Sequence, residues 1–379
     1  MDLRKHKASL LLNFRNIKGW RTNRRIIVIE SDDWGSIRMP SKNVFNKMLK
    51  ADIRVDKCPY NRYDSLENKY DLEALFEILS KYKDSKGNHP IITTNFVTAN
   101  PDFKKIKKSE YNEYHYELFT DTYKHYCNNS DTFEVCKQGI SNKLIYPQFH
   151  GREHLNVNRW IKALKRNQHE TRLAFQNEMF GLSTTITKEN RKSYMAALDF
   201  DDISEMSDQK KILIEGLRLF KEIFGYESET FIAANYIWHS SLENTLASCG
   251  VKTLQGSFKQ ISPSGDGHRS RQIRHRMGEM NDVGQIYLTR NAVFEPSLNI
   301  SPDPVADCLK EIETAFRWGK PAIICSHRLN FIGSIEKENR DKNLKLLNKL
   351  LGKILRKYQN VEFMSTDSLG KTIKADKAE

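Results

Sequence analysis

Short apolar runs alternate with longer amphipathic segments along most of the chain. The runs are rich in β-branched and aromatic residues and are bounded by Gly, Pro, Asn or charged residues, a pattern typical of buried β-strands. We interpret eight of them as strands: RRIIVIES (24–31), HPIITTNFV (89–97), KLIYPQFHG (143–151), ETFIAANY (229–236), GVKTLQGSF (250–258), QIYLTRNAVF (285–294), PAIICSHRLN (321–330) and VEFMSTDSL (361–369).

Segments with apolar residues at helical spacing separate many of these runs. They are DLEALFEILSKYKD (71–84), LNVNRWIKALKRN (155–167), QKKILIEGLRLFKEIFG (209–225), SLENTLASCG (241–250), VADCLKEIETAFRWG (305–319) and KNLKLLNKLLGKILRKY (342–358). Strands that alternate with amphipathic helices predict βα units and a parallel sheet. With seven or eight such strands, we expect an α/β fold in the form of a distorted (β/α) barrel.

The spacing of the predicted strands is uneven. Polar, aromatic segments near 98–140 and 166–208 do not fit a bare βα repeat, and we expect them to be loop insertions that wall a cleft. The polar segment 260–284 predicts an exposed or mobile loop. We therefore expect an N-terminal basic segment, residues 1–24, followed by one catalytic domain over 25–370.

Composition places the chain among globular proteins, because 39% of its residues are hydrophobic and 10% are aromatic. Its six cysteines are scattered without a C-x-x-C pair, which favours reduced thiols. No window reaches the roughly 20 apolar residues of a membrane span, and the apolar run near the N-terminus is too short for a signal peptide. We expect a cytoplasmic protein, with peripheral membrane association as an alternative.

The net charge is +13, with basic runs at 21–25, 104–108 and 269–276. Such charge attracts anionic partners, for example an acidic glycan or nucleic acid. The runs lie far apart and contain few aromatic residues, however, so a solvated lysine-rich surface explains them better. We expect no nucleic-acid partner.

Ionisable residues follow three of the apolar runs, at the strand ends where (β/α) barrels build their active sites. They are Asp32 and Asp33, His150 and His154, and His327. In HGREH (150–154) the imidazoles are four residues apart, so a helical turn would place both on one face, where they can bind a single metal ion. The alternatives are a surface histidine pair, two capping aspartates, and a buried histidine bonded to backbone.

The order of these residues resembles the polysaccharide deacetylase family, the nodulation-protein-like carbohydrate esterases, over about 25–365. The resemblance implies a distorted (β/α) barrel that removes acyl groups, usually acetyl from N-acetylated amino sugars, with one divalent metal ion. It also implies site roles: Asp32 as catalytic base, Asp33, His150 and His154 as metal ligands, and His327 as catalytic acid.

Zinc is the metal that best suits the implied ligand set, and cobalt, nickel and manganese are the alternatives. In the implied reaction, Asp32 takes a proton from metal-bound water and His327 protonates the departing amine. The expected partner is an acylated carbohydrate. If this carbohydrate carries an anionic group, the basic protein would attract it.

Two elements of the family pattern are missing from this sequence. An Arg-x-Pro-Tyr stretch is replaced by IAANY (232–236), and no Asp-Trp element is visible. Arg290 would supply the missing charge and Glu295 the missing carboxylate, unless both are exposed loop charges. The backbone N–H for an oxyanion would come from near Asn235 or Tyr236. Trp34, in DDW, is either an aromatic wall for a sugar ring or a core residue.

These observations predict a metal-dependent hydrolase that removes an acyl group from an amino sugar or polysaccharide. The favoured acyl group is N-acetyl. One alternative is an amidase or esterase that uses the same residues on a non-sugar substrate. A second is a glycan-binding protein with a degenerate active site, although a binding module has no need for a base, an acid and a metal triad together. The sequence leaves the oligomeric state open.

Overall fold

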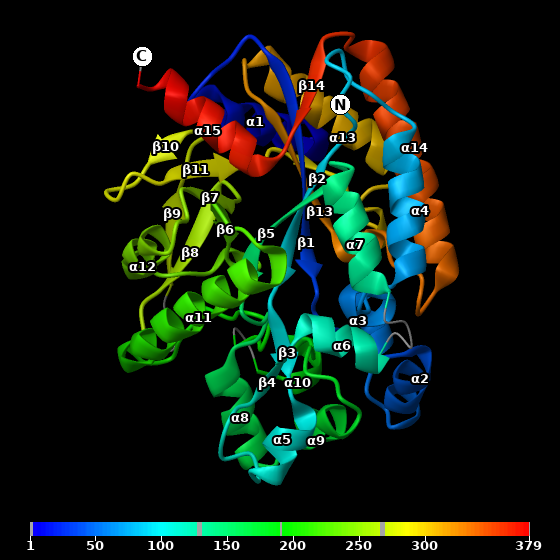
Figure 1. Ribbon diagram of the computed structural model, residues 1–379, viewed down its shortest axis with the longest axis vertical. Coiled ribbons are helices and arrows are strands. Elements are labelled where there is room, and N and C mark those ends of the chain that lie inside the picture. The colour runs from blue at the N-terminus through cyan, green and yellow to red at the C-terminus, as the bar shows by residue number, and fades with distance from the viewer. Residues whose placement is uncertain (1–2, 127–130, 190–191, 266–269, 379) are drawn as a thin grey trace.

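The computed structural model describes residues 3–126, 131–189, 192–265 and 270–378. Figure 1 shows its strands and helices. The strands are β1 (Arg25–Trp34), β2 (Ile92–Val97), β3 (Ala99–Pro101), β4 (Tyr116–Leu118), β5 (Ile145–Gly151), β6 (Thr230–Ile232), β7 (Thr253–Gly256), β8 (Lys259–Pro263), β9 (Ser270–Arg274), β10 (Glu279–Met280), β11 (Ile286–Thr289), β12 (Ala292–Val293), β13 (Ala322–His327) and β14 (Val361–Met364).

The helices follow the strands in most of the chain. They are α1 (Leu3–Ile17), α2 (Lys42–Lys50), α3 (Pro59–Tyr63), α4 (Lys69–Ser80), α5 (Phe103–Lys108), α6 (Phe119–Tyr126), α7 (Thr132–Ser141), α8 (Val157–Lys165), α9 (His169–Gln176), α10 (Thr184–Thr187), α11 (Met206–Phe224), α12 (Glu243–Ser248), α13 (Pro304–Arg317), α14 (Lys337–Lys357) and α15 (Thr366–Asp376). The six helices expected from periodicity correspond to α4, α8, α11, α12, α13 and α14.

The largest sheet is parallel apart from one edge pair. Its strand order is β10-β11-β7-β6-β5-β2-β1-β13-β12, and β14 pairs with the first half of β1. Within this sheet, the one antiparallel pair among the described residues is that of β10 with β11. Every predicted strand run contributes a strand to this sheet, so the expected α/β fold with a parallel sheet is confirmed. The segment 286–293 pairs with β7 through β11 and with β13 through β12.

Two buried apolar clusters hold the helices against this sheet. The larger joins α4, α13 and α14 to β1 and β13 and includes Leu75, Ile312 and Leu347. The second joins α11 and α12 to β5, β6 and β7. Here α11 lies very close to β5, because a Cβ on Gly216 would sit 2.6 Å from Cζ of Phe149. That contact fixes the strand one residue before His150.

Parts of the two segments expected as insertions lie at one end of the sheet. Figure 1 shows β3, β4, α5, α8, α9 and α10 together beyond the end toward which the β1 arrow points, with α1 and α15 at the opposite end. Parallel strands present their carboxyl ends on one edge, so these insertions lie over the edge where an active site is expected.

The expectation of a loop over 260–284 is wrong in part. The strands β8 and β9 form an antiparallel pair that runs from Lys259 opposite Arg274 to Pro263 opposite Ser270. The strand β9 is exposed along almost its whole length and contains only one apolar residue, Ile273. It therefore lacks the apolar and polar alternation by which a half-buried strand is recognised.

The basic segment that precedes β1 is helical over Leu3–Ile17, and this helix contacts α13. The ammonium group of Lys320 donates hydrogen bonds to the carbonyl oxygens of Gly19 and Trp20 at 2.6 and 2.7 Å, which ties the link between α1 and β1 to the fold.

None of the helices in the described ranges is long and apolar enough to cross a membrane. The described cysteines, Cys58, Cys136, Cys249, Cys308 and Cys325, are all free thiols, as the sequence predicts, whereas Cys127 lies outside the described residues.

Candidate active site

A local irregularity at the end of β1 explains how two adjacent aspartates face one cavity. Neighbouring residues of a regular strand point to opposite faces. The register between β1 and β2 shifts between Ser31 and Trp34, and Asp33 has a φ of 74° in the left-handed region. A bulge of this kind re-aims a side chain, and here it turns Asp33 to the side that Asp32 already faces.

Asp33, His150 and His154 form a compact set of potential metal ligands. One ligand atom from each residue lies within 4.8 Å of the others, and all three side chains are buried. The Nε2 atoms of His150 and His154 lie 3.3 and 3.2 Å from Oδ1 of Asp33. The structure therefore brings together the three residues that the sequence predicts as ligands.

The hydrogen bonds around this set fit a divalent metal ion. Nδ1 of His150 lies 2.9 Å from the carbonyl oxygen of Ile232, which leaves Nε2 with its lone pair directed at the cluster. Nδ1 of His154 is buried and has no hydrogen-bond partner among the described residues. Two imidazole nitrogens and one carboxylate oxygen are donors that a catalytic zinc ion accepts, with positions left open.

The charge state of the cluster also suits a cation. Burial lowers the pKa of His154 to about 3, and the nearby His150 and Arg38 act in the same direction, so the imidazole is neutral. Burial opposes ionisation of Asp33, but the guanidinium of Arg38 and the hydrogen bond with His150 act against it, and the pKa of this carboxyl is held well below its ordinary value. A buried anion beside the neutral imidazole of His154 can bind a metal ion.

Asp32 is held as a carboxylate by Arg290. Nη1 and Nη2 of Arg290 donate to the two oxygens of Asp32 at 2.6 and 2.7 Å, and its Nε donates to Glu30 at 2.6 Å. Nδ2 of Asn95 donates a further bond to Asp32 at 2.7 Å. Burial disfavours the charge, but Arg290 prevails and lowers the pKa of Asp32 below its ordinary value. Arg290 thus lies beside Asp32, where it can supply the charge of the arginine that is missing from the family pattern.

His327 is paired with Glu295. Nδ1 of His327 lies 2.5 Å from Oε1 of Glu295, whose Oε2 accepts a bond from Nδ2 of Asn330 at 2.7 Å. Burial disfavours the imidazolium, but the charge and hydrogen bond of Glu295 raise the pKa of His327 well above its ordinary value. Nε2 of His327 lies 3.8 Å from Asp32, and the ring edge meets Tyr60 with centroids 5.4 Å apart.

One cavity of about 340 Å³ at the carboxyl ends of the strands is lined by Asp32, Asp33, His150, His154 and His327. Asn235 and Tyr236 also line it, and both have a positive φ. The N–H of Tyr236 is bonded to the carbonyl of Ala233, which leaves the N–H of Asn235 as the candidate for an oxyanion. Trp34 does not line the cavity: it is 1% exposed, donates to Ser31 and packs on Phe96, which matches its interpretation as a core residue.

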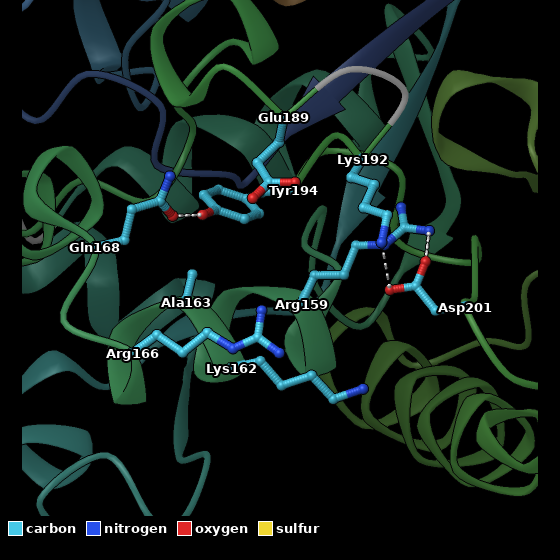
Figure 2. A pocket seen from close by; sticks show the side chains of 9 residues that line it. All are labelled: Arg159, Lys162, Ala163, Arg166, Gln168, Glu189, Lys192, Tyr194 and Asp201. Atoms are coloured by element: carbon cyan, nitrogen blue, oxygen red, sulfur yellow. Dashed lines mark hydrogen bonds and ion pairs between the residues drawn. The ribbon is translucent and has the colours of Figure 1, made fainter. Parts of the chain in front are cut away.

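A second cavity, of about 470 Å³, lies behind one wall of the first. Ser193 and Met195 line the first cavity, and Lys192 and Tyr194 line the second. Figure 2 shows Arg159, Lys162 and Arg166 on one side of it, with Glu189, Tyr194 and Lys192 across from them.

Carboxylates already neutralise most of the positive charge around the second cavity. Arg159 donates to Asp199 and Asp201 at 2.7 and 2.9 Å, and Lys162 donates to Glu205 at 3.2 Å. Because its lining contains neither histidine nor cysteine, this cavity offers no comparable chemistry.

Sequence reasoning missed Arg38, Tyr60, Asn95 and Asn330. Asn95 offers a usable signal, because it is a polar residue inside the apolar run of β2 near its carboxyl end. Asn330 follows His327 by three residues in a short turn, which is a weaker signal. Arg38 and Tyr60 lie in connections whose path depends on the whole fold, and no spacing rule identifies them.

Comparison with known proteins gives matches only at the level of solved structures. No family model matches the chain, and no curated protein sequence matches it. The 4-alpha-glucanotransferase from Thermococcus litoralis is 9% identical with a TM-score of 0.46, and the match covers 91% of this chain. This chain spans only 40% of the length of that enzyme.

Two further solved structures match over nearly their whole length. Puue allantoinase has a TM-score of 0.44 at 9% identity, with 94% of this chain and 92% of the other covered. A probable polysaccharide deacetylase from Pseudomonas aeruginosa has a TM-score of 0.44 at 9% identity, with 92% and 91% covered. Polysaccharide deacetylases are thus among the structural neighbours of this chain.

Proposed function

We propose that this protein is a metal-dependent hydrolase that removes an acyl group from an amino sugar or polysaccharide. The favoured acyl group is N-acetyl. The observation that carries the proposal is the combination of three units in one cavity: the carboxylate of Asp32 held ionised by Arg290, the buried set of Asp33 with two histidines, and His327 paired with Glu295. The carbohydrate as substrate rests on the sequence resemblance, and the hydroxyl and amide side chains around the cavity suit it.

In the proposed reaction, a divalent ion is held by Asp33, His150 and His154. Zinc is the favoured ion. When bound, such an ion polarises the acyl carbonyl and makes a water molecule more acidic. Asp32 accepts the proton of the attacking water, since its low pKa and the two bonds from Arg290 keep it in the basic form. His327, protonated through its pair with Glu295, donates a proton to the nitrogen of the departing amine.

We also propose that the catalytic domain is a distorted (β/α) barrel over residues 25–370, with insertions near 98–140 and 166–208. Support comes from the segment 286–293, which pairs with β7 and with β13 and so links strands from distant parts of the sheet order.

Acyl release and metal content together test this function. We expect one divalent ion per chain and acetate release from some member of a panel of N-acetylated sugars and oligosaccharides. Asp32→Asn and His327→Ala should lower turnover by about a hundredfold or more with metal content intact. His150→Ala should lose metal as well, whereas His125→Ala, on the exposed surface of α6, should behave as the unaltered protein.

Two outcomes would contradict the proposal. A purified protein that takes up no divalent ion in stoichiometric amount would refute the metal-dependent reaction. Release from non-sugar amides or esters, with none from any acylated sugar, would keep the chemistry and replace the substrate class.

A further inference from the structure

Asp33 uses its two carboxylate oxygens for different partners. Oδ1 faces Nε2 of His150 and of His154, whereas Oδ2 accepts a hydrogen bond from Nη2 of Arg38 at 3.1 Å. Because the guanidinium occupies Oδ2, only Oδ1 is directed toward the two imidazoles. A buried cation therefore lies one carboxylate group away from the position where a second cation is proposed to bind.

Arg38 is fixed in this position by its surroundings. It is only 4% exposed, and its Nε lies 3.7 Å from Oδ2 of Asp64. The backbone at Gly181 passes directly over its stem, since a Cβ there would lie 2.8 Å from Cδ of Arg38. The guanidinium also lies over the ring of Tyr60, 5.3 Å from its centroid. Arg38 therefore cannot turn away from Asp33 when an ion approaches.

A row of buried charges continues from Arg38 to the turn after His327. Asp64 accepts two bonds from Arg328 at 3.1 Å, and Nη1 of Arg328 donates to Glu67 at 2.6 Å. Asp64, Glu67 and Arg328 are fully buried. The charge of Arg38 is thus partly balanced by Asp64, which it shares with Arg328.

We propose that Arg38 is a positioning residue of the metal centre that holds Asp33 as a one-oxygen ligand and lowers the affinity of the centre for divalent ions. The inference rests on the proposed function, because it takes Asp33, His150 and His154 as ligands. Groups that hydrogen-bond to metal ligands orient those ligands and tune the metal. Two effects compete when Arg38 is removed: Asp33 becomes less well oriented, and a positive charge disappears beside the ion.

The second effect is the larger one in a buried site. A hydrogen bond to a carboxylate contributes a net gain of only about twice that of a neutral hydrogen bond, whereas repulsion between a guanidinium and a dication acts at short range with little solvent screening. Loss of the charge should therefore tighten metal binding. Loss of the charge of Asp64, which partly balances Arg38, should have the opposite effect.

Zinc affinity measured by competition with a chromophoric chelator tests this inference on the full-length, metal-stripped protein. Arg38→Met should bind zinc more tightly by roughly tenfold or more, and Arg38→Lys, which keeps the charge, should stay close to the unaltered protein. Asp64→Asn should bind zinc more weakly. Arg159→Met is the matched control, because Arg159 is also buried and paired with two aspartates but lies at the second cavity; its zinc affinity should not change.

Thermal unfolding with and without zinc gives a second readout. Metal-free Arg38→Met should be less stable than the unaltered protein and should gain more from added zinc, because the stabilisation by a ligand grows with the logarithm of its affinity. Opposite changes in Arg38→Met and Asp64→Asn cannot arise from general damage to the fold.

Several results would overturn the inference. Weaker or unchanged zinc binding in Arg38→Met would show that Arg38 only supports the structure. A raised KM with unchanged zinc affinity would make Arg38 a substrate-binding residue instead. If the unaltered protein does not bind zinc, the proposed function fails as well, so the two failures are distinguishable.

Discussion

Replacement of Arg290 by Met tests the electrostatic design of the candidate site. Arg290 donates three short, charge-assisted hydrogen bonds to Asp32 and Glu30, and all three side chains are nearly inaccessible to solvent. Met has a similar length but no charge, so Arg290→Met leaves two buried carboxylates without their cation. Removing one partner of a buried pair costs about 3–5 kcal/mol, which is a large part of the stability of a typical folded protein.

The cost should depend on pH with a definite sign. Without Arg290, burial raises the pKa of at least one of the two carboxyls in the folded protein, whereas an unfolded glutamate has a pKa of about 4.3. The folded variant then holds a proton that the unfolded chain releases, so its stability falls as pH rises from about 4.3 toward the raised folded pKa. Relative to the unaltered protein, we expect a penalty of about 3–5 kcal/mol at pH 8 and one smaller by roughly 1–3 kcal/mol at pH 5.5.

Urea unfolding of metal-stripped protein at both pH values measures this difference. The double variant Glu30→Gln/Arg290→Met is the control, since it removes one of the two uncompensated charges and should recover about 1–2 kcal/mol at pH 8. A penalty below about 1 kcal/mol at pH 8, or a larger penalty at pH 5.5 than at pH 8, would refute the reasoning.

Two further variants address separate groups. Burial raises the pKa of Glu311 to about 7, although the N–H of Val293 donates to this carboxyl at 2.7 Å and acts in the opposite direction. The native protein should therefore lose stability as pH rises from about 4.5 to about 7. Glu311→Gln keeps the acceptor, so urea unfolding should show a gain on the order of 1–2 kcal/mol at pH 8 and none at pH 4, and an equal gain at both would contradict this. Glu295→Gln should lower kcat on the order of a hundredfold, with metal content and KM nearly unchanged, because His327 loses the charge that favours its protonated form; an unchanged kcat in a steady-state assay would remove Glu295 from the reaction.

The sequence predicts the strands of the large sheet well because those strands are buried on both faces. Continuous apolar runs such as 26–29 and 322–325 are nearly unambiguous when helical segments separate them. The pair β8–β9 escaped prediction for the opposite reason, since its side chains are mostly charged or polar and β9 is exposed. Strand order was also beyond reach, because pairing of β14 with the first half of β1 depends on contacts between residues more than 300 positions apart.

Prediction of the site was limited by local backbone geometry. The sequence identifies Asp32 and Asp33 as a pair. No pattern in the sequence predicts the register shift that turns both side chains toward the cavity and leaves Trp34 in the core. Arg38 was missed although it lies only five residues after Asp33. Its role depends on Asp64, which a separate part of the chain brings beside it.

The placement of Arg290 and Glu295 supports the proposed function although two elements of the family pattern are missing. A cation beside a buried carboxylate keeps it ionised, and an anion beside an imidazole keeps it protonated, whichever strand supplies the partner. Here both come from one segment, which pairs with β7 as far as Thr289 and with β13 from Ala292 onward. Side chains alternate along a strand, so a slip of one residue would turn Arg290 away from Asp32. The two pairings prevent that slip, because the N–H of Arg290 bonds to the carbonyl of Gly256 on one side and the N–H of Asn291 bonds to that of Ile323 on the other.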